Sequence, residues 1–284
     1  MTDWGPRRPR DGRGRTSRPR LWVRRFAALV LIAAVGLGIW WLVAAARSGG
    51  PGTGAAAGSP PAESASPSTT PSPEPAAPPL PACDVGDRPA ARRGYGAWKR
   101  TLLDTTFGLK ASYAPPDLVS TLQAGFADDE PVRLELIGDL SELRLAAQGA
   151  GNPVGIVAGY RSYEQQAILF DQRVGELGLE EAQTRVARPG HSEHQLGTAV
   201  DFKIAGHKDV TIRFGNTRHG RWLFDHAWEY GFVLSYPFGA TITTCYASEP
   251  WHYRYFGKEM AAKMHASGLA TREYLWDLQF DPTP

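Results

Sequence analysis

The last 237 residues of this 284-residue chain lack an excess of positive charge. Residues 1–47 hold ten arginines against two aspartates, a charge of +8, so the net charge of +2 for the whole chain leaves −6 for the rest. A nucleic-acid-binding domain needs a basic surface that neutralises phosphates. We therefore expect no nucleic-acid partner, and the basic amino terminus requires another explanation.

Residues 26–46 contain no charged side chain. At about 1.5 Å per residue, a helix of this length spans roughly 30 Å, the thickness of the hydrocarbon core of a bilayer. Nine arginines precede the segment and only Arg47 closely follows it, which favours a cytoplasmic amino terminus. We predict a basic cytoplasmic tail over 1–25 and a single-pass anchor in the cell membrane over 26–46. The alternative is a signal peptide cleaved at the small residues 44–46.

Residues 47–82 have almost no apolar side chain larger than alanine and consist mainly of Pro, Ala, Ser, Gly and Thr. Such a composition cannot bury a core and stays extended. At a polyproline rise of about 3.1 Å per residue, it reaches at most roughly 100 Å. We predict a disordered linker that tethers one folded domain, residues 83–284, on the outer side of the membrane.

Cysteine is also scarce, and the only two, Cys83 and Cys245, both follow the predicted anchor. An even number of cysteines in an exported region predicts one disulfide. It would join the start of the folded domain to the segment just before Glu249. A zinc-binding Cys245 is the less favoured alternative.

Two separate stretches concentrate side chains that bind metals. Residues 189–202 read as a loop, broken by Pro189 and Gly190, and then a strand. The loop carries His194 and the strand carries Asp201, whereas residues 249–255 carry His252 three positions after Glu249. Three protein ligands, an open position for water and a non-ligating carboxylate are typical of a catalytic zinc site. We expect one Zn²⁺ per chain on His194, Asp201 and His252, with Glu249 as general base.

The neighbouring polar residues suggest further roles. Arg161 should clamp the terminal carboxylate of a peptide or the developing oxyanion, because a planar guanidinium suits both. Ser192 should hydrogen-bond the substrate, since no base relay is apparent that would make it a nucleophile. Gln166 should line the cleft. We expect His191 to lie at the rim or behind the ligands, and Glu193 to face solvent.

The order of elements predicts an α+β fold, a small antiparallel sheet with helices packed around it and the zinc site on the sheet. Ser162 and Gln165 form a capping-box pattern that begins a helix, and Gly178 ends it. A polar stretch, 206–220, is a candidate rim or lid. The sequence predicts strands at 154–158, 198–203, 232–235, 241–246 and 251–255, the last two paired, and helices at 139–147, 163–177, 180–186, 221–230, 258–266 and 272–278.

Three blocks of the sequence together resemble a known family. They are SxHxxGxAxD at 192–201, ExWH at 249–252, and GYRSY at 159–163 with Gln166 downstream. In order and separation they are similar to the VanY-type D-alanyl-D-alanine carboxypeptidases, zinc peptidases of the wider group that includes the lysostaphin-like enzymes. The resemblance covers roughly residues 102–257. One departure is Cys245, where an ordinary strand residue is expected.

This resemblance implies a zinc carboxypeptidase that trims the C-terminal D-residue from peptidoglycan stem peptides with a metal-activated water. It implies the general-base role for Glu249. Two enzymatic alternatives share the same zinc chemistry, an L,D-carboxypeptidase and a peptidoglycan endopeptidase. A third alternative is a tethered wall-binding module without activity, but a purely structural zinc does not need a spare base.

Overall fold

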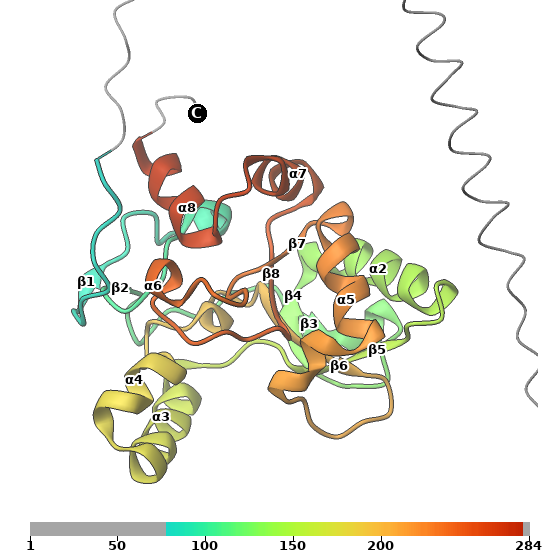
Figure 1. Ribbon diagram of the computed structural model, residues 1–284, viewed down its shortest axis with the longest axis horizontal. Coiled ribbons are helices and arrows are strands. Elements are labelled where there is room, and N and C mark those ends of the chain that lie inside the picture. The colour runs from blue at the N-terminus through green and yellow to red at the C-terminus, as the bar shows by residue number, and fades with distance from the viewer. Residues whose placement is uncertain (1–77, 281–284) are drawn as a thin grey trace, which may run out of the picture. The chain divides into compact units, whose positions relative to one another are not determined.

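The computed structural model describes residues 78–280 of the chain (Figure 1). Their main sheet has four antiparallel strands in the order β5-β6-β8-β7. These strands are β5 (Val154–Ala158), β6 (Ala199–Ile204), β7 (Phe232–Leu234) and β8 (His252–Tyr255). Two small ribbons accompany it: β1 (Arg88–Pro89) pairs in parallel with β2 (Phe107–Gly108), and β3 (Leu118–Ser120) pairs antiparallel with β4 (Pro131–Arg133).

Helices surround the sheet (Figure 1). They are α2 (Ile137–Gly149), α3 (Tyr163–Leu177), α4 (Leu179–Arg185), α5 (Arg218–His226), α6 (Thr241–Thr244), α7 (Lys258–Ser267) and α8 (Thr271–Phe280). Among the shorter 3₁₀ turns, η4 (Glu193–Leu196) precedes β6, and η5 (Ile212–Asn216) precedes α5. This arrangement confirms the prediction of small sheets with helices packed around them.

The two faces of the sheet carry different side chains, apolar on one and polar on the other, because side chains alternate along each strand. Val200 and Phe202 of β6 and Tyr253 and Tyr255 of β8 belong to the main hydrophobic core. Apolar residues of α2 and α5 cover that face, among them Leu140, Leu143 and Leu223. The intervening residues, including Asp201, His252 and Arg254, are buried on the opposite face. Thus the strand pattern that builds the core also directs polar side chains to one place.

The local signals for α3 are confirmed. The Ser162 side chain accepts a hydrogen bond from the Gln165 amide, and the Gln165 side chain accepts one from the Ser162 amide. This capping box satisfies two amides that the first turn of a helix leaves unpaired. Gly178 follows the last residue of α3. The other predicted helices also form, with ends shifted by a few residues, except that the helix predicted over 221–230 divides into α5 and a 3₁₀ turn over Ala227–Tyr230.

The prediction of a strand over 241–246 is wrong. Residues Thr241–Thr244 form the short helix α6, and Cys245 follows it with a left-handed φ of 70°. The β-branched residues of this segment favour a strand by propensity. However, β8 already pairs with β6 on one side and β7 on the other, so it has no free edge for the predicted partner.

Covalent and polar contacts join the start of the folded domain to the segments around α6 and α8. Cys83 and Cys245 form a disulfide whose Cα atoms lie 5.2 Å apart, although 162 positions separate them in the sequence. Nearby, the buried Arg272 of α8 donates to the Asp104 carboxylate and to the carbonyl oxygens of Thr243 and Pro81. These contacts fix the segment before β1 against α6 and α8.

No helix within residues 78–280 is long and apolar enough to cross a membrane. The predicted cytoplasmic tail, the anchor over 26–46 and the linker as far as residue 77 lie outside the described residues. They remain predictions from the sequence.

Candidate metal centre and active site

Three predicted ligands meet on the polar face of the main sheet. Strands β6 and β8 pair with Asp201 directly opposite His252, so their side chains emerge side by side. His194 lies on η4, five residues before the first residue of β6, and its ring stands edge-on to the ring of His252. One ligand atom from each residue lies within 4.8 Å of the other two, and all three residues are buried. The geometry is that of a small cage for one ion.

Hydrogen bonds fix which nitrogen of His194 faces this cage. Its Nδ1 donates to the carbonyl oxygen of Gly159, at 2.6 Å, so Nε2 keeps its lone pair and lies 3.3 Å from Asp201 Oδ2. Gly159 must be glycine here, because a Cβ would collide with the carbonyl oxygen of Pro131. The close approach of β4 to the end of β5 thus sets the position of the carbonyl that orients His194.

His252 turns the other ring nitrogen, Nδ1, toward the cage. Its Nε2 lies 3.0 Å from Glu193 Oε2, whereas Nδ1 lies 3.1 Å from Asp201 Oδ1 and 3.7 Å from Glu249 Oε2. A proton on Nε2, donated to Glu193, leaves the lone pair on Nδ1 inside the cage. A carboxylate behind a ligand imidazole is the usual way in which proteins fix such a ring.

The prediction that Glu193 faces solvent is wrong, because the residue is only 3% exposed. Its carboxylate accepts hydrogen bonds from Arg254 Nη1 at 2.8 Å and Ser235 Oγ at 2.6 Å, besides contacting His252. Burial raises the pKa of the Glu193 carboxyl, but Arg254 and His252 outweigh burial and hold this pKa at about 2. Glu193 is therefore an ionised buried support for His252.

Electrostatics inside the cage favour a cation. Burial raises the pKa of the Asp201 carboxyl, yet the two imidazoles outweigh it and hold the pKa far below its usual range. Burial lowers the pKa of His194, although Asp201 opposes this, so its imidazole tends to be neutral. For His252, hydrogen bonds to Asp201 and Glu193 outweigh burial and raise the pKa to about 10. Without a metal the His252 ring therefore carries a second proton at neutral pH. A Zn²⁺ that replaced this proton would meet a buried carboxylate and two imidazole nitrogens, a donor set that zinc prefers.

Glu249 lies beside the cage and not within it. Its amide donates to the carbonyl oxygen of Tyr236, and its side chain is 24% exposed next to His252. Burial raises the pKa of the Glu249 carboxyl to about 7, with His252 lowering it and Asp201 raising it further. A carboxyl with a pKa near neutrality can both take and return a proton.

The other predicted site residues are Arg161, Gln166 and Ser192. Together with the three residues of the cage, they line a cavity of about 170 Å³. Arg161 donates through Nη1 to Gln166 Oε1 at 2.9 Å, and Gln166 Nε2 donates to the carbonyl oxygen of Ala187. The buried Gln166 thus positions the guanidinium of Arg161 over the cavity. The Ser192 hydroxyl accepts from the His194 amide, at 3.3 Å, and caps η4.

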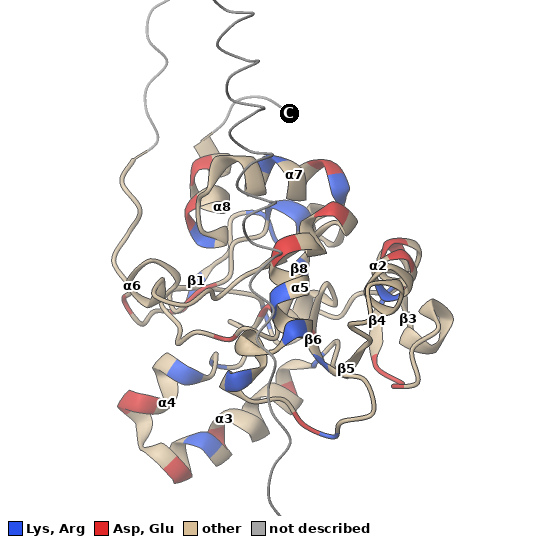
Figure 2. Cartoon of the chain, turned by 45° about the vertical axis from the view of Figure 1, so that its right-hand side comes forward, with Lys and Arg blue, Asp and Glu red and all other residues tan. Residues whose placement is uncertain are grey.

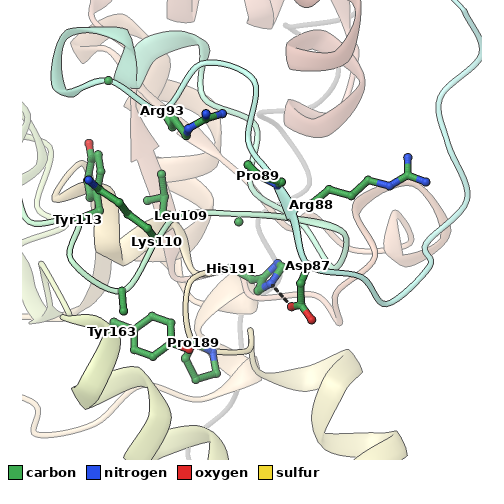
Figure 3. Close-up of a pocket in the computed structure, with 13 residues that line it drawn as sticks. Asp87, Arg88, Pro89, Arg93, Leu109, Lys110, Tyr113, Tyr163, Pro189 and His191 are labelled. Atoms are coloured by element: carbon green, nitrogen blue, oxygen red, sulfur yellow. Dashed lines mark hydrogen bonds and ion pairs between the residues drawn. The ribbon is translucent and has the colours of Figure 1, made fainter.

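His191 is not part of this cage. It lines a separate, larger cavity of about 600 Å³, where its ring points toward Asp87 (Figure 3). Its Nδ1 lies 2.8 Å from the carbonyl oxygen of Asp104. The predicted lid, 206–220, does not line the cavity of the cage either. Phe214 from this stretch packs into the main core instead.

Sequence reasoning missed several residues around the cage. Arg254 could have been found, because it shares a strand face with His252, and so could Trp251, which belongs to the ExWH block. Leu169 and Arg173 follow Gln166 at helical spacing on α3, whereas no sequence pattern indicates the rest. The additional lining residues are Leu169, Arg173, Arg185, Val186, Ala187, Tyr236, Tyr246 and Trp251.

Removing the support behind His252 should destabilise the fold. Glu193→Ala would leave the Arg254 guanidinium buried without its charge partner, which typically costs about 3–5 kcal/mol. The matched control is Glu259→Ala, which removes an exposed ion pair with Lys263 on α7 and should change stability little. Urea denaturation measures both free energies of unfolding, and equal, small losses in the two variants would contradict this role of Glu193.

Comparisons with known proteins identify a family model and several relatives that this chain resembles. The model of the VanY D-alanyl-D-alanine carboxypeptidase family matches residues 129–258. The putative carboxypeptidase YodJ of Bacillus subtilis is 36% identical over 179 residues, which cover 61% of this chain and 65% of that protein. The bifunctional D-Ala-D-Ala dipeptidase and carboxypeptidase VanXYC of Enterococcus gallinarum is 30% identical over 176 residues, which cover 61% of this chain and 91% of that protein. This chain therefore spans slightly less than two thirds of the length of YodJ.

Two solved structures share the fold. The LD-carboxypeptidase LdcB is 35% identical with a TM-score of 0.55, over 61% of this chain and 83% of that one. A variant of the vancomycin-resistance D,D-pentapeptidase VanY, in complex with Zn(II), is 32% identical with a TM-score of 0.54, over 63% of this chain and 99% of that one. The family match over residues 129–258 includes all three residues of the metal cage, and with these relatives it shows that the chain belongs to the VanY family of D-alanyl-D-alanine carboxypeptidases.

Proposed function

We propose that this protein is a zinc carboxypeptidase that removes the C-terminal D-alanine from peptidoglycan stem peptides, with one Zn²⁺ on His194, Asp201 and His252. The observation that carries the proposal is the buried cage itself, with one nitrogen of each imidazole turned inward and a non-ligating glutamate beside it. The Zn(II) complex of the related VanY structure supports the choice of metal.

A bound Zn²⁺ would polarise the scissile carbonyl and acidify a water molecule. His194 would coordinate through Nε2 and His252 through Nδ1, since their other nitrogens face Gly159 and Glu193. Glu249 takes the proton from the attacking water and delivers it to the nitrogen of the leaving D-residue. Burial raises its pKa to about 7, which suits both steps, whereas a cation in the cage would lower this pKa and keep the carboxylate ionised before the proton transfer.

Arg161 binds the terminal carboxylate of the substrate. Its Nη1 is engaged by Gln166, so the guanidinium is oriented before the substrate arrives. The Ser192 hydroxyl lies on the cavity wall, from which it can hydrogen-bond the peptide. A free C-terminus is thereby recognised by charge, which makes the enzyme a carboxypeptidase and not an endopeptidase.

An L,D-carboxypeptidase is the second candidate. The likeness to LdcB supports it, since its identity and TM-score are close to those of the D,D-pentapeptidase. The two activities differ in the chirality of the residue before the scissile bond. Incubation with a pentapeptide that ends in D-Ala-D-Ala and with a tetrapeptide that ends in L-Lys-D-Ala, followed by mass spectrometry, distinguishes them.

We also propose that the catalytic domain acts outside the cytoplasmic membrane, held by a helix over 26–46 and the linker over 47–82. The uncharged 21-residue stretch and the arginines that precede it support this location. The disulfide between Cys83 and Cys245 agrees with an oxidising compartment.

The proposed ligands can be tested by metal analysis. Protein from residue 83 onward should contain about one zinc per chain, and His194→Ala or His252→Ala should abolish stoichiometric binding, because a catalytic site has only three protein ligands. His226→Ala, on the exposed part of α5, is the control and should retain the metal. Full zinc occupancy in both ligand variants would contradict the assignment.

The role of Glu249 can be separated from metal binding. Glu249→Gln should retain zinc and the fold but lose roughly 10²- to 10⁴-fold in kcat, the usual contribution of a general base. Turnover of a D-Ala-D-Ala pentapeptide and the zinc content are measured on the same preparation. A variant with nearly full activity would show that Glu249 is not the base.

The role of Arg161 predicts a dependence on the free C-terminus. Arg161→Lys keeps the charge but loses the planar fork, so it should reduce kcat/KM for a peptide with a free terminal carboxylate. For a C-terminally amidated peptide the wild type should already be slow, and the substitution should make little further difference. Equal cleavage of both peptides by the wild type would favour an endopeptidase.

A further inference from the structure

The cavity of the metal cage has more arginines than the terminal carboxylate of a peptide requires. Besides Arg161, it is lined by Arg173 from α3 and by Arg185, the last residue of α4. Among the described residues, the acidic side chains that line it are Glu193, Asp201 and Glu249. Glu193 is already paired with Arg254, and the other two belong to the catalytic centre. No acidic side chain that lines the cavity therefore pairs with Arg173 or Arg185, whose partners, Glu176 and Glu181, lie outside its lining.

Neither additional arginine is needed to hold the fold. Arg173 pairs with Glu176 within α3 and Arg185 pairs with Glu181 within α4, and the two arginine side chains are 45% and 56% exposed. Exposed pairs within one helix contribute little to stability. Each guanidinium can therefore exchange its glutamate for a carboxylate of a ligand at small cost. Figure 2 shows both signs of charge along α3 and α4.

The position of Arg185 relative to the catalytic centre is fixed by the chain. Ala187, two residues after Arg185, accepts the hydrogen bond from Gln166 Nε2 at 2.7 Å, and Gln166 also holds Arg161. The hydrogen bond of Gln166 to Ala187 therefore holds the end of α4 close to Arg161. Arg173 lies two turns further along the same helix as Gln166 and lines the same cavity.

The size of the cavity shows which part of a substrate these arginines meet. Its volume of about 170 Å³ is below the roughly 300–1,000 Å³ of typical small-molecule sites. It accommodates the end of a peptide, so the preceding residues must lie over the half-exposed rim. Arg173 and Arg185 form part of that rim.

We propose that Arg173 and Arg185 form a second carboxylate-binding subsite, which selects peptides with a free carboxylate on the amino-terminal side of the scissile bond. The subsite deepens the proposed function and rests on it. Arg161 takes the terminal carboxylate, and the rim arginines take a carboxylate carried by a preceding residue. Peptides in which this second carboxylate is a neutral amide are then the poorer substrates.

The test uses two peptides that end in D-Ala-D-Ala and differ only in the side chain of the residue before this dipeptide, a free carboxylate in one and its primary amide in the other. With the zinc-loaded protein, kcat/KM should be about tenfold higher for the free carboxylate, as expected for charge-assisted hydrogen bonds to a partly exposed site. In the double variant Arg173→Gln/Arg185→Gln, this ratio should fall to within about twofold of unity.

Two further variants test whether the loss of the kcat/KM ratio comes from the lost guanidinium groups and not from any substitution of an arginine. Arg173→Lys/Arg185→Lys keeps the charge and should retain a clear preference for the free carboxylate. Arg213→Gln changes an exposed arginine of η5, which does not line the cavity, and should leave the ratio at the wild-type value. A ratio of one in the wild type, or an unchanged ratio in the Gln double variant, overturns the subsite and leaves the carboxypeptidase proposal standing.

If the wild type cleaves neither peptide, the proposed function fails. The subsite is then tested by the binding affinities of the two peptides. Calorimetry with the zinc-loaded Glu249→Gln variant compares the affinities of the two uncleaved peptides. A preference of about tenfold for the free carboxylate, lost in the additional Gln double variant, supports the subsite. Equal affinities overturn it.

Discussion

A carboxylate that stays ionised in a protein interior needs a cation beside it, and in this fold that carboxylate is Asp201. It lies between two buried imidazoles, each of which turns one nitrogen toward it. A proton on His252 can supply the positive charge, and so can a divalent metal that uses the lone pairs of both rings. The rest of the site serves to keep these three side chains in this arrangement.

The arrangement is secured by contacts outside the cage. Gly159 at the end of β5 orients His194, and Glu193 orients His252 from behind. Arg254 balances the charge of Glu193 and also donates to the carbonyl oxygens of Trp98 and Thr101, which connects the centre to the segment before the sheet. Because every one of these partners is buried or is backbone, the rings have little freedom to turn. Such outer contacts typically change metal affinity about 10- to 100-fold.

Much of this architecture could be predicted from local patterns. The capping box at Ser162, the stop at Gly178 and the strand that carries Asp201 depend on neighbouring residues, and they form as expected. The meeting of His194, Asp201 and His252 followed from the three blocks and not from spacing alone, since 51 positions separate Asp201 from His252. The burial of Glu193 and the helix at Thr241–Thr244 could not be predicted in this way. Both depend on which strands are neighbours, in particular on β8 having partners on both sides.

The central claim is that this cage holds a catalytic zinc. Anomalous diffraction above and below the zinc absorption edge, from crystals of the zinc-loaded domain, tests it most directly. The account predicts a single anomalous peak about 2.0–2.2 Å from His194 Nε2, His252 Nδ1 and an Asp201 carboxylate oxygen, with Glu249 outside the coordination sphere. A peak elsewhere, coordination through the opposite imidazole nitrogens, or direct coordination by Glu249 would contradict it.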